Sequence, residues 1–215
     1  MPEVALNALE LRLQKQVESV RAALDRGQPG PAAELCAQIL AEQPSCFGLR
    51  QLERTALLRL AGERPSGLSR VVRAVSVSPF LLSGSLRLKD EPRLAVASAE
   101  KVLRRDPNHV GALELLGQAA QALGWTETAV FAWSIARELE PDRTDLQLAL
   151  GRALVAAGRT PGAAALAREV LRRQPGHAGA IELQREAEVT AARREWVRAG
   201  GDRSETATPF PKKKG

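Results

Sequence analysis

Leucine and alanine positions recur with a regular period through the second half of the chain. Leu116 and Leu150 are 34 apart, and so are Ala129 and Ala163. Small residues such as Ala136 accompany them where two helices must approach closely. A repeated apolar pattern of this length predicts stacked structural units, because each unit needs its neighbours to bury its apolar face.

Glycine and proline divide each period into two helices. Three prolines keep the same spacing, at Pro107, Pro141 and Pro175. Gly124 and Gly158, also 34 apart, mark the end of the first helix, because a left-handed cap costs glycine nothing. The second helix is predicted to start at Thr126 or Thr160, with Thr160 as the N-cap. It ends before the proline, which cannot continue a helix.

The unit from Val110 to Asp142 has the most complete set of landmarks: Leu113, Leu116, Gly117, Ala120, Ala129, Trp133, Ala136 and Pro141. In order and spacing they resemble the tetratricopeptide repeat (TPR), with leucine for its usual first tryptophan, alanine for tyrosine and tryptophan for phenylalanine. The resemblance covers three units, about Ser76 to His177. It implies an all-α fold, a right-handed α-solenoid of 34-residue helical hairpins.

Weaker signals extend the pattern on both sides. A divergent hairpin is expected near the N-terminus, where the same offsets are kept by Gly27, Ala32, Cys36, Ile39 and Pro44. The helix expected over 46–60 has no obvious partner. The chain thus divides into N-terminal helices (1–62), a linker (63–75), three repeats with a closing helix (76–198) and a flexible basic tail (199–215). The closing helix, 178–198, is expected to pack through Ile181, Leu183, Ala187 and Val189.

Composition narrows the class of protein. Hydrophobic residues make up 44% of the sequence but aromatic residues only 3%, so leucine, alanine and valine must form the core, which suits close-packed helices. A membrane-spanning helix needs roughly 20 residues. The longest uncharged stretch in the middle of the chain, over 74–86, is too short for one. Two cysteines, Cys36 and Cys46, are too few for a disulfide framework. We expect buried thiols and a cytoplasmic location.

Candidate catalytic groups are few. His109 and His177 are two whole periods apart, so they occupy equivalent turns and cannot share a substrate or a metal ion. The string Ser98-Ala99-Glu100-Lys101 lacks the companion motifs of penicillin-interacting enzymes. The sequence contains no phosphate-binding loop, metalloprotease motif or dinucleotide fingerprint. We therefore expect a protein that is not an enzyme and needs no cofactor or metal.

The resemblance to TPR proteins also implies a binding surface, the concave face lined by the first helix of each hairpin. The corresponding residues, with one from the closing helix, are Val77, Phe80, Leu81, Arg87, Leu88, Glu114, Leu115, Gln118, Gln121, Asp145, Leu148, Arg152, Val155 and Glu182. The lysine and asparagine that chaperone-tail binders use to grip a terminal carboxylate are absent at these positions. A helical or extended peptide with an apolar anchor fits this surface better.

Phe80 and Leu81 are candidates for that apolar anchor. Phe80, Leu81 and Leu82 are consecutive, so at about 100° per residue they span too wide an arc for one packing face. If Leu82 is the packing residue, Phe80 and Leu81 either face a partner or are covered by the helix over 46–60.

Three functional hypotheses follow. The first is a non-catalytic adaptor or scaffold whose concave face binds a protein segment. The second is an accessory factor that contacts RNA, a ribosome or an acidic surface through the basic tail. Residues after 190 supply +4 of the net charge of +6, and the chain ends on a lysine cluster, Lys212, Lys213 and Lys214. The third is self-association through the N-terminal helices.

Overall fold

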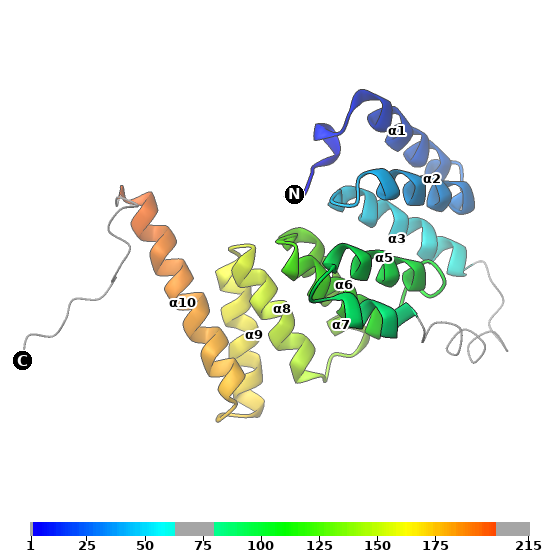
Figure 1. The fold of residues 1–215 in the computed structure, drawn as a ribbon. Helices are drawn as coiled ribbons and strands as arrows, with labels where there is room; N and C mark the ends of the chain where they lie inside the picture. The colour runs from blue at the N-terminus through cyan, green and yellow to red at the C-terminus, as the bar shows by residue number, and fades with distance from the viewer. Residues whose placement is uncertain (1, 63–79, 201–215) are drawn as a thin grey trace, which may run out of the picture.

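The computed structural model describes residues 2–62 and 80–200, and within these ranges the chain is almost entirely helical (Figure 1). A short 3-10 turn, Leu6–Ala8, comes first, and residues 80–87 form a helical segment ahead of α5. The α-helices are α1 (Leu11–Asp25), α2 (Pro29–Glu42), α3 (Phe47–Gly62), α5 (Pro92–Leu103), α6 (Val110–Ala122), α7 (Thr126–Leu139), α8 (Thr144–Ala156), α9 (Thr160–Arg173) and α10 (Ala178–Arg198). The linker over 63–75, Val77 and the three tail lysines lie outside the described residues.

Consecutive helices pack as hairpins, which confirms the predicted all-α solenoid. The predicted turns are correct, since Gly124 and Gly158 have φ of +70° and +72°. α7 and α9 begin at Thr126 and Thr160, as the period required. The prediction that Thr160 caps α9 is wrong: Arg159 holds the cap position and Thr160 is the buried first residue of the helix. The Arg159 carbonyl already accepts from the Ala163 backbone nitrogen at 3.3 Å, so the helical bonds begin one residue earlier than expected.

Leucine, alanine and tryptophan form the core between the hairpins. Trp125 is fully buried at the start of α7, and Trp133, 4% exposed, lies against α6. A Cβ atom on Gly117 of α6 would lie 2.5 Å from Trp133 Cε2, so glycine is needed for the indole to reach the helix backbone. The small residues predicted at the close approaches, including Ala129 and Ala163, are buried as expected.

The N-terminal helices form a cluster of their own. α1 and α2 form a hairpin with Gly27 at φ +69°, which supports the divergent repeat expected there. The helix expected over 46–60, for which the sequence offers no obvious partner, is α3, and it packs against α2 and contacts α7. Cys36 and Cys46 are buried free thiols in this cluster. Burial, followed by the nearby Glu53 carboxylate, raises the pKa of Cys36 to about 12.

Arg50 connects α3 to the repeats. Its side chain is only 3% exposed and pairs with Glu100 of α5, with a nitrogen–oxygen distance of 3.0 Å. The same guanidinium donates to Thr128 of α7 at 3.4 Å and to the carbonyl of Pro44. It also lies over the Trp125 ring, 5.1 Å from its centroid. One buried cation therefore bridges α3, α5 and α7.

Further hydrogen bonds and ion pairs join α3 to α5 and to the turn that follows α5. Glu53 of α3 accepts a hydrogen bond of 2.7 Å from Arg104, and the carboxylate is buried. Desolvation raises the pKa of Glu53 above its ordinary value, while Arg104 opposes that shift. Arg54 donates to the backbone carbonyl of Pro107 and, at 2.9 Å, to the Asn108 side chain in the turn after α5. Ion pairs and hydrogen bonds thus contribute to the docking of α3.

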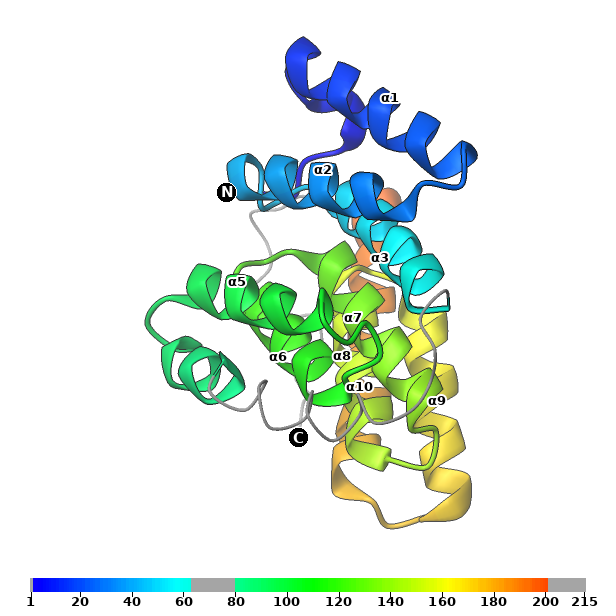
Figure 2. The same ribbon diagram turned by 90° about the vertical axis from the view of Figure 1, so that its right-hand side faces the viewer.

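The chain's N-terminal segment reaches the same part of the array. The Glu3 carboxylate accepts hydrogen bonds of 2.8 Å from the backbone nitrogens of Glu127 and Thr128 in the first turn of α7. An anion at a helix N-terminus satisfies unpaired N–H groups and the positive end of the helix dipole. Phe47 at the start of α3 also meets Phe131 of α7 edge to face, with ring centroids 5.6 Å apart. Figure 2 shows α1–α3 placed over the α5–α7 part of the array.

α10 closes the array at the opposite end from α1 (Figure 1). The sequence predicts that four apolar side chains of α10 face the last repeat, and only half of that prediction is correct. Leu183 and Ala187 are buried, but Ile181 and Val189 are exposed. The packing face of α10 instead follows Ala180, Leu183 and Ala187, which lie on one side of the helix. No helix in the described part of the chain is both long and apolar enough to cross a bilayer.

Candidate functional site

A groove of about 250 Å³ lies between the first helices of two successive hairpins, α6 and α8. Its lining combines side chains from α6 and α8 with one tryptophan of α7: Glu114, Gln118, Gln121, Trp133, Asp145, Leu146, Ala149 and Arg152. The hairpin repeat places these residues together, because equivalent positions on stacked helices line one continuous face. The groove therefore brings together part of the predicted binding surface.

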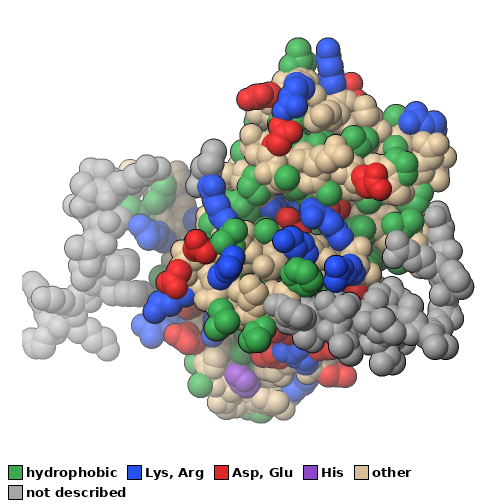
Figure 3. Space-filling model, turned by 45° about the vertical axis from the view of Figure 1, so that its right-hand side comes forward, with side chains coloured by type: hydrophobic (Ala, Val, Ile, Leu, Met, Phe, Trp, Pro, Cys, Tyr) green, Lys and Arg blue, Asp and Glu red, His purple; other side chains and the backbone are tan. Residues whose placement is uncertain are grey.

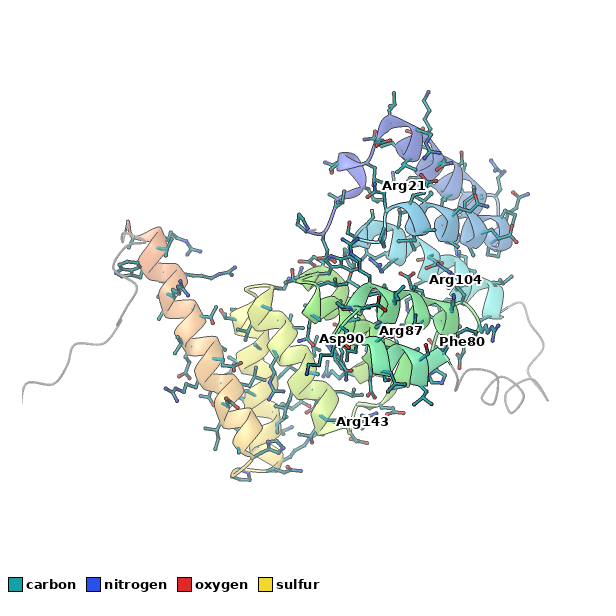
Figure 4. All side chains as sticks on the ribbon, in the orientation of Figure 1. Arg21, Phe80, Arg87, Asp90, Arg104 and Arg143 are labelled. Atoms are coloured by element: carbon teal, nitrogen blue, oxygen red, sulfur yellow. The ribbon has the colours of Figure 1, made fainter. Side chains whose placement is uncertain are left out.

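Arg143 organises the acidic end of the groove. Its guanidinium donates to Glu114 at 2.6 Å and to Glu140 at 3.0 Å, and it also forms a two-point pair with Asp145. These bonds lower the pKa of Asp145 and raise that of Arg143. Figure 4 shows Arg143 at the turn that leads into α8. Three carboxylates and one arginine thus form a fixed, net acidic cluster.

Trp133 and Gln121 form the wall at the C-terminal end of α6. The indole nitrogen of Trp133 donates to the Gln121 side-chain oxygen at 3.1 Å, which leaves the Gln121 amide nitrogen pointing away from that bond. Gln118 and Arg152 are exposed at the same surface and have no hydrogen-bond or ion-pair partner among the described residues. The groove therefore presents an arginine and two amides to a ligand.

Five residues of the predicted binding surface meet in this groove. They are Glu114, Gln118, Gln121, Asp145 and Arg152. Two others, Leu115 and Leu148, are only 3% and 7% exposed and belong to the core, which corrects the prediction that they face a partner. Each fills the space beside a glycine on a neighbouring helix, Gly84 for Leu115 and Gly179 for Leu148.

The helical segment 80–87 is rotated relative to the prediction. Leu82 is 66% exposed, so it is not the packing residue, whereas Leu81 packs against the core and Gly84 is buried. Phe80 is half-buried against α5, with Lys101 and Arg105 over its ring at 5.8 and 5.2 Å from the centroid. The helix over 46–60 is not what covers it.

The remaining predicted residues are dispersed. Arg87 is exposed and Leu88 half-buried at the end of the segment 80–87. Val155 is half-buried against the last hairpin, and Glu182 is exposed on α10. Figure 3 shows lysine and arginine side chains gathered over the middle of one face, with hydrophobic side chains between them. None of the four residues Arg87, Leu88, Val155 and Glu182 lines the groove.

The histidines occupy structural positions. His109 is the N-cap of α6, and its Nδ1 accepts from the backbone nitrogen of Ala112 at 3.2 Å. His177 holds the same place before α10. Across residues 2–62 and 80–200, no group of three or more histidine, cysteine, aspartate or glutamate side chains is placed to hold a metal ion.

Arg143 is the functional candidate that sequence reasoning missed. It lies one full period from both His109 and His177, at the same N-cap position. The replacement of histidine by arginine at one of three equivalent positions was a signal available in the sequence. Its neighbours Glu140 and Asp145, each within three residues, supplied the matching charges.

Comparison with known proteins gives a structural likeness. No family model and no curated protein matches the sequence. Among solved structures, the chain is similar to the crystal structure of MamA, with 15% sequence identity and a TM-score of 0.41. The match covers 82% of this chain and 96% of that chain. The helical hairpins of α5–α10 remain the basis for assigning the solenoid fold.

Proposed function

We propose that this protein is a non-catalytic adaptor of the TPR type that binds a protein segment along the face formed by α6 and α8. The observation that carries the proposal is the groove itself, where five residues selected for this role by their place in the repeat line one surface. Arg143 and Trp133 hold Glu114, Asp145 and Gln121 in place, so these groups need little further ordering on binding.

The chemistry of the groove indicates what kind of segment fits. Arg152 offers an unpaired cation for a carboxylate of the ligand, and Gln118 and Gln121 offer amides for a peptide backbone. Leu146 and Ala149 supply a short apolar floor between them. A segment with an acidic residue beside a small apolar one complements this surface.

The test is capture of binding proteins on the full chain from its native lysate, comparing wild type with Arg152→Glu. Arg168→Glu is the matched control, because Arg168 is an exposed arginine on α9, outside the groove. A defined protein retained by wild type and by the control, but lost with Arg152→Glu, supports the proposal. Equal retention by both variants contradicts it.

The salt dependence of capture separates this function from the alternative one. Groove binding is expected to weaken at high salt through Arg152 but to keep its apolar component, because screening leaves apolar contacts largely intact. Nucleic acid, or a mixture of acidic proteins released together at high salt, points to the basic tail with Lys212, Lys213 and Lys214. That outcome replaces the adaptor proposal with contact to an acidic surface.

A further inference from the structure

The outer face of α10 carries exposed apolar side chains among its charged ones. Ile181, Val189, Trp196 and Val197 are 52%, 44%, 39% and 41% exposed. Terminal units of solenoids normally carry a polar outer face, which keeps the array soluble and stops further stacking. An exposed apolar face of this kind marks a contact surface.

Three of these side chains form one stripe, with the exposed Arg185 between Ile181 and Val189. Val189 follows Ile181 by eight positions and Trp196 follows Val189 by seven. At about 100° per residue, the three side chains lie within about 80° of one another around the helix. The stripe extends along about 22 Å of the helix axis. Val197 lies outside it, about 80° or more from each of the three.

The position of α10 leaves this stripe open. The buried side chains Ala180, Leu183 and Ala187 face α8 and α9. Figure 1 shows the other side of α10 turned away from the helices of the array. The last residues of α10, from Ala192 onward, are exposed on every side. The stripe therefore has room for another helix.

Charges beside the stripe identify the helix that fits. Glu182 and Glu186 lie on one flank in the N-terminal half of α10, and Arg193 lies on the same flank in the C-terminal half. All three side chains are exposed and have no partner among the described residues. An identical helix laid antiparallel places Arg193 between the two glutamates of the other copy, twice by symmetry.

The same arrangement matches the apolar residues. Ile181 of one copy faces Trp196 of the other, and Val189 lies next to the two-fold axis. In this register Arg185 of one copy lies opposite Ala192 of the other, which leaves a cation inside the contact and weakens it. Glu188, on the opposite flank, meets its own copy near the axis and limits the strength of the pair.

We propose that α10 is a self-association helix, through which two copies of this chain pair antiparallel along the stripe of Ile181, Val189 and Trp196. The contact is one helix long, so we expect dimerisation in the micromolar range. It places the grooves of the two copies on one assembly and is independent of what those grooves bind.

The first test is sedimentation of the full chain across the micromolar range. Wild type is expected to shift from monomer to dimer, and Val189→Glu to remain monomeric. Val197→Glu is the matched control, because it introduces the same charge at a similarly exposed valine of the same helix but outside the stripe. A wild type that stays monomeric overturns the proposal, as does a dimer that survives Val189→Glu.

A second test addresses the orientation. Arg193→Glu should weaken dimerisation about tenfold or more, since it places three acids together. Reversing the whole set, Glu182→Arg with Glu186→Arg and Arg193→Glu, should restore it. No recovery in the triple variant overturns the antiparallel pairing.

Disulfide trapping gives an independent measure of the same geometry. Val189→Cys should cross-link two copies rapidly, because the two side chains meet at the axis, whereas Ile181→Cys should not. The native thiols of Cys36 and Cys46 are buried and do not compete. Rapid cross-linking of Ile181→Cys indicates a parallel pair and overturns the proposal.

Discussion

Replacing Arg50 with methionine removes the cation that joins α3 to the repeats. The variant keeps the apolar volume over Trp125 but leaves Glu100, 8% exposed, with only Arg104 at 3.7 Å. Arg104 already serves Glu53, so two buried carboxylates then share one arginine. Removing one partner of a buried ion pair costs about 3–5 kcal/mol of the free energy of unfolding. We expect a loss in that range.

Urea unfolding followed by tryptophan fluorescence measures this loss. With a slope of about 2–3 kcal/mol per molar urea, the unfolding midpoint should fall by about 1–2.5 M. Limited proteolysis should cut α1–α3 before α5–α10, because the variant loses one of the contacts that connect the two parts. Coincidence of fluorescence and circular dichroism curves checks that the change is one transition.

The double variant Arg50→Met with Glu100→Leu separates electrostatics from packing. Removing both charges leaves no unpaired carboxylate at that position, so most of the lost stability should return. A single-variant loss below about 1 kcal/mol, or a double variant no more stable than the single one, would refute the assignment of Arg50 as the connecting cation.

Further perturbations test other features. Gly117→Ala forces a methyl group against the Trp133 indole and should cost about 1–3 kcal/mol in thermal or urea unfolding. Gly111→Ala on the same helix, where a Cβ would make only ordinary contacts at 3.4 Å or more, should instead gain up to about 1 kcal/mol. Cys36 should resist thiol reagents at pH 8 until the protein is unfolded, because burial raises its pKa to about 12; rapid labelling of the native protein contradicts this. Burial also raises the pKa of Glu53 above 4.5, so its ionised form destabilises the fold. Glu53→Gln should therefore have a larger free energy of unfolding than wild type at pH 7. The difference should vanish as the pH falls below 4.5, where the wild-type carboxyl is protonated in both states. A difference that stays constant from pH 4 to 8 refutes this role of the Glu53 charge.

The periodic part of the fold could be predicted from the sequence. Gly124 and Gly158 fixed the turns, because only glycine enters the left-handed region without strain, and prolines fixed the helix ends. The TPR resemblance implied which positions line the concave face, and counting back from the prolines placed them on Glu114, Gln118 and Arg152. The same count also selected Leu115 and Leu148, which are buried in the core.

Features outside the period could not be predicted in this way. Arg50 and Glu100 are far apart in the sequence, and nothing in the order of charges matches one arginine with one glutamate. The sequence also failed to predict which face of the segment 80–87 is buried. Leucine occupies both faces there, at Leu81 and Leu82, and no glycine marks the turn at Asp90. Where apolar residues surround a helix, packing with neighbours decides which one is buried.

The bonds of α3 have a mechanical consequence. A solenoid bends like a spring, because each hairpin rotates slightly against the next. α3 acts as a strut across two successive hairpins, bonded to Glu100 on α5 and to Thr128 on α7. Any change of curvature between those hairpins must break these bonds. The α8–α10 part has no such bonds to α3, so it should change its curvature more easily. A pulling force on the chain should stretch that end first.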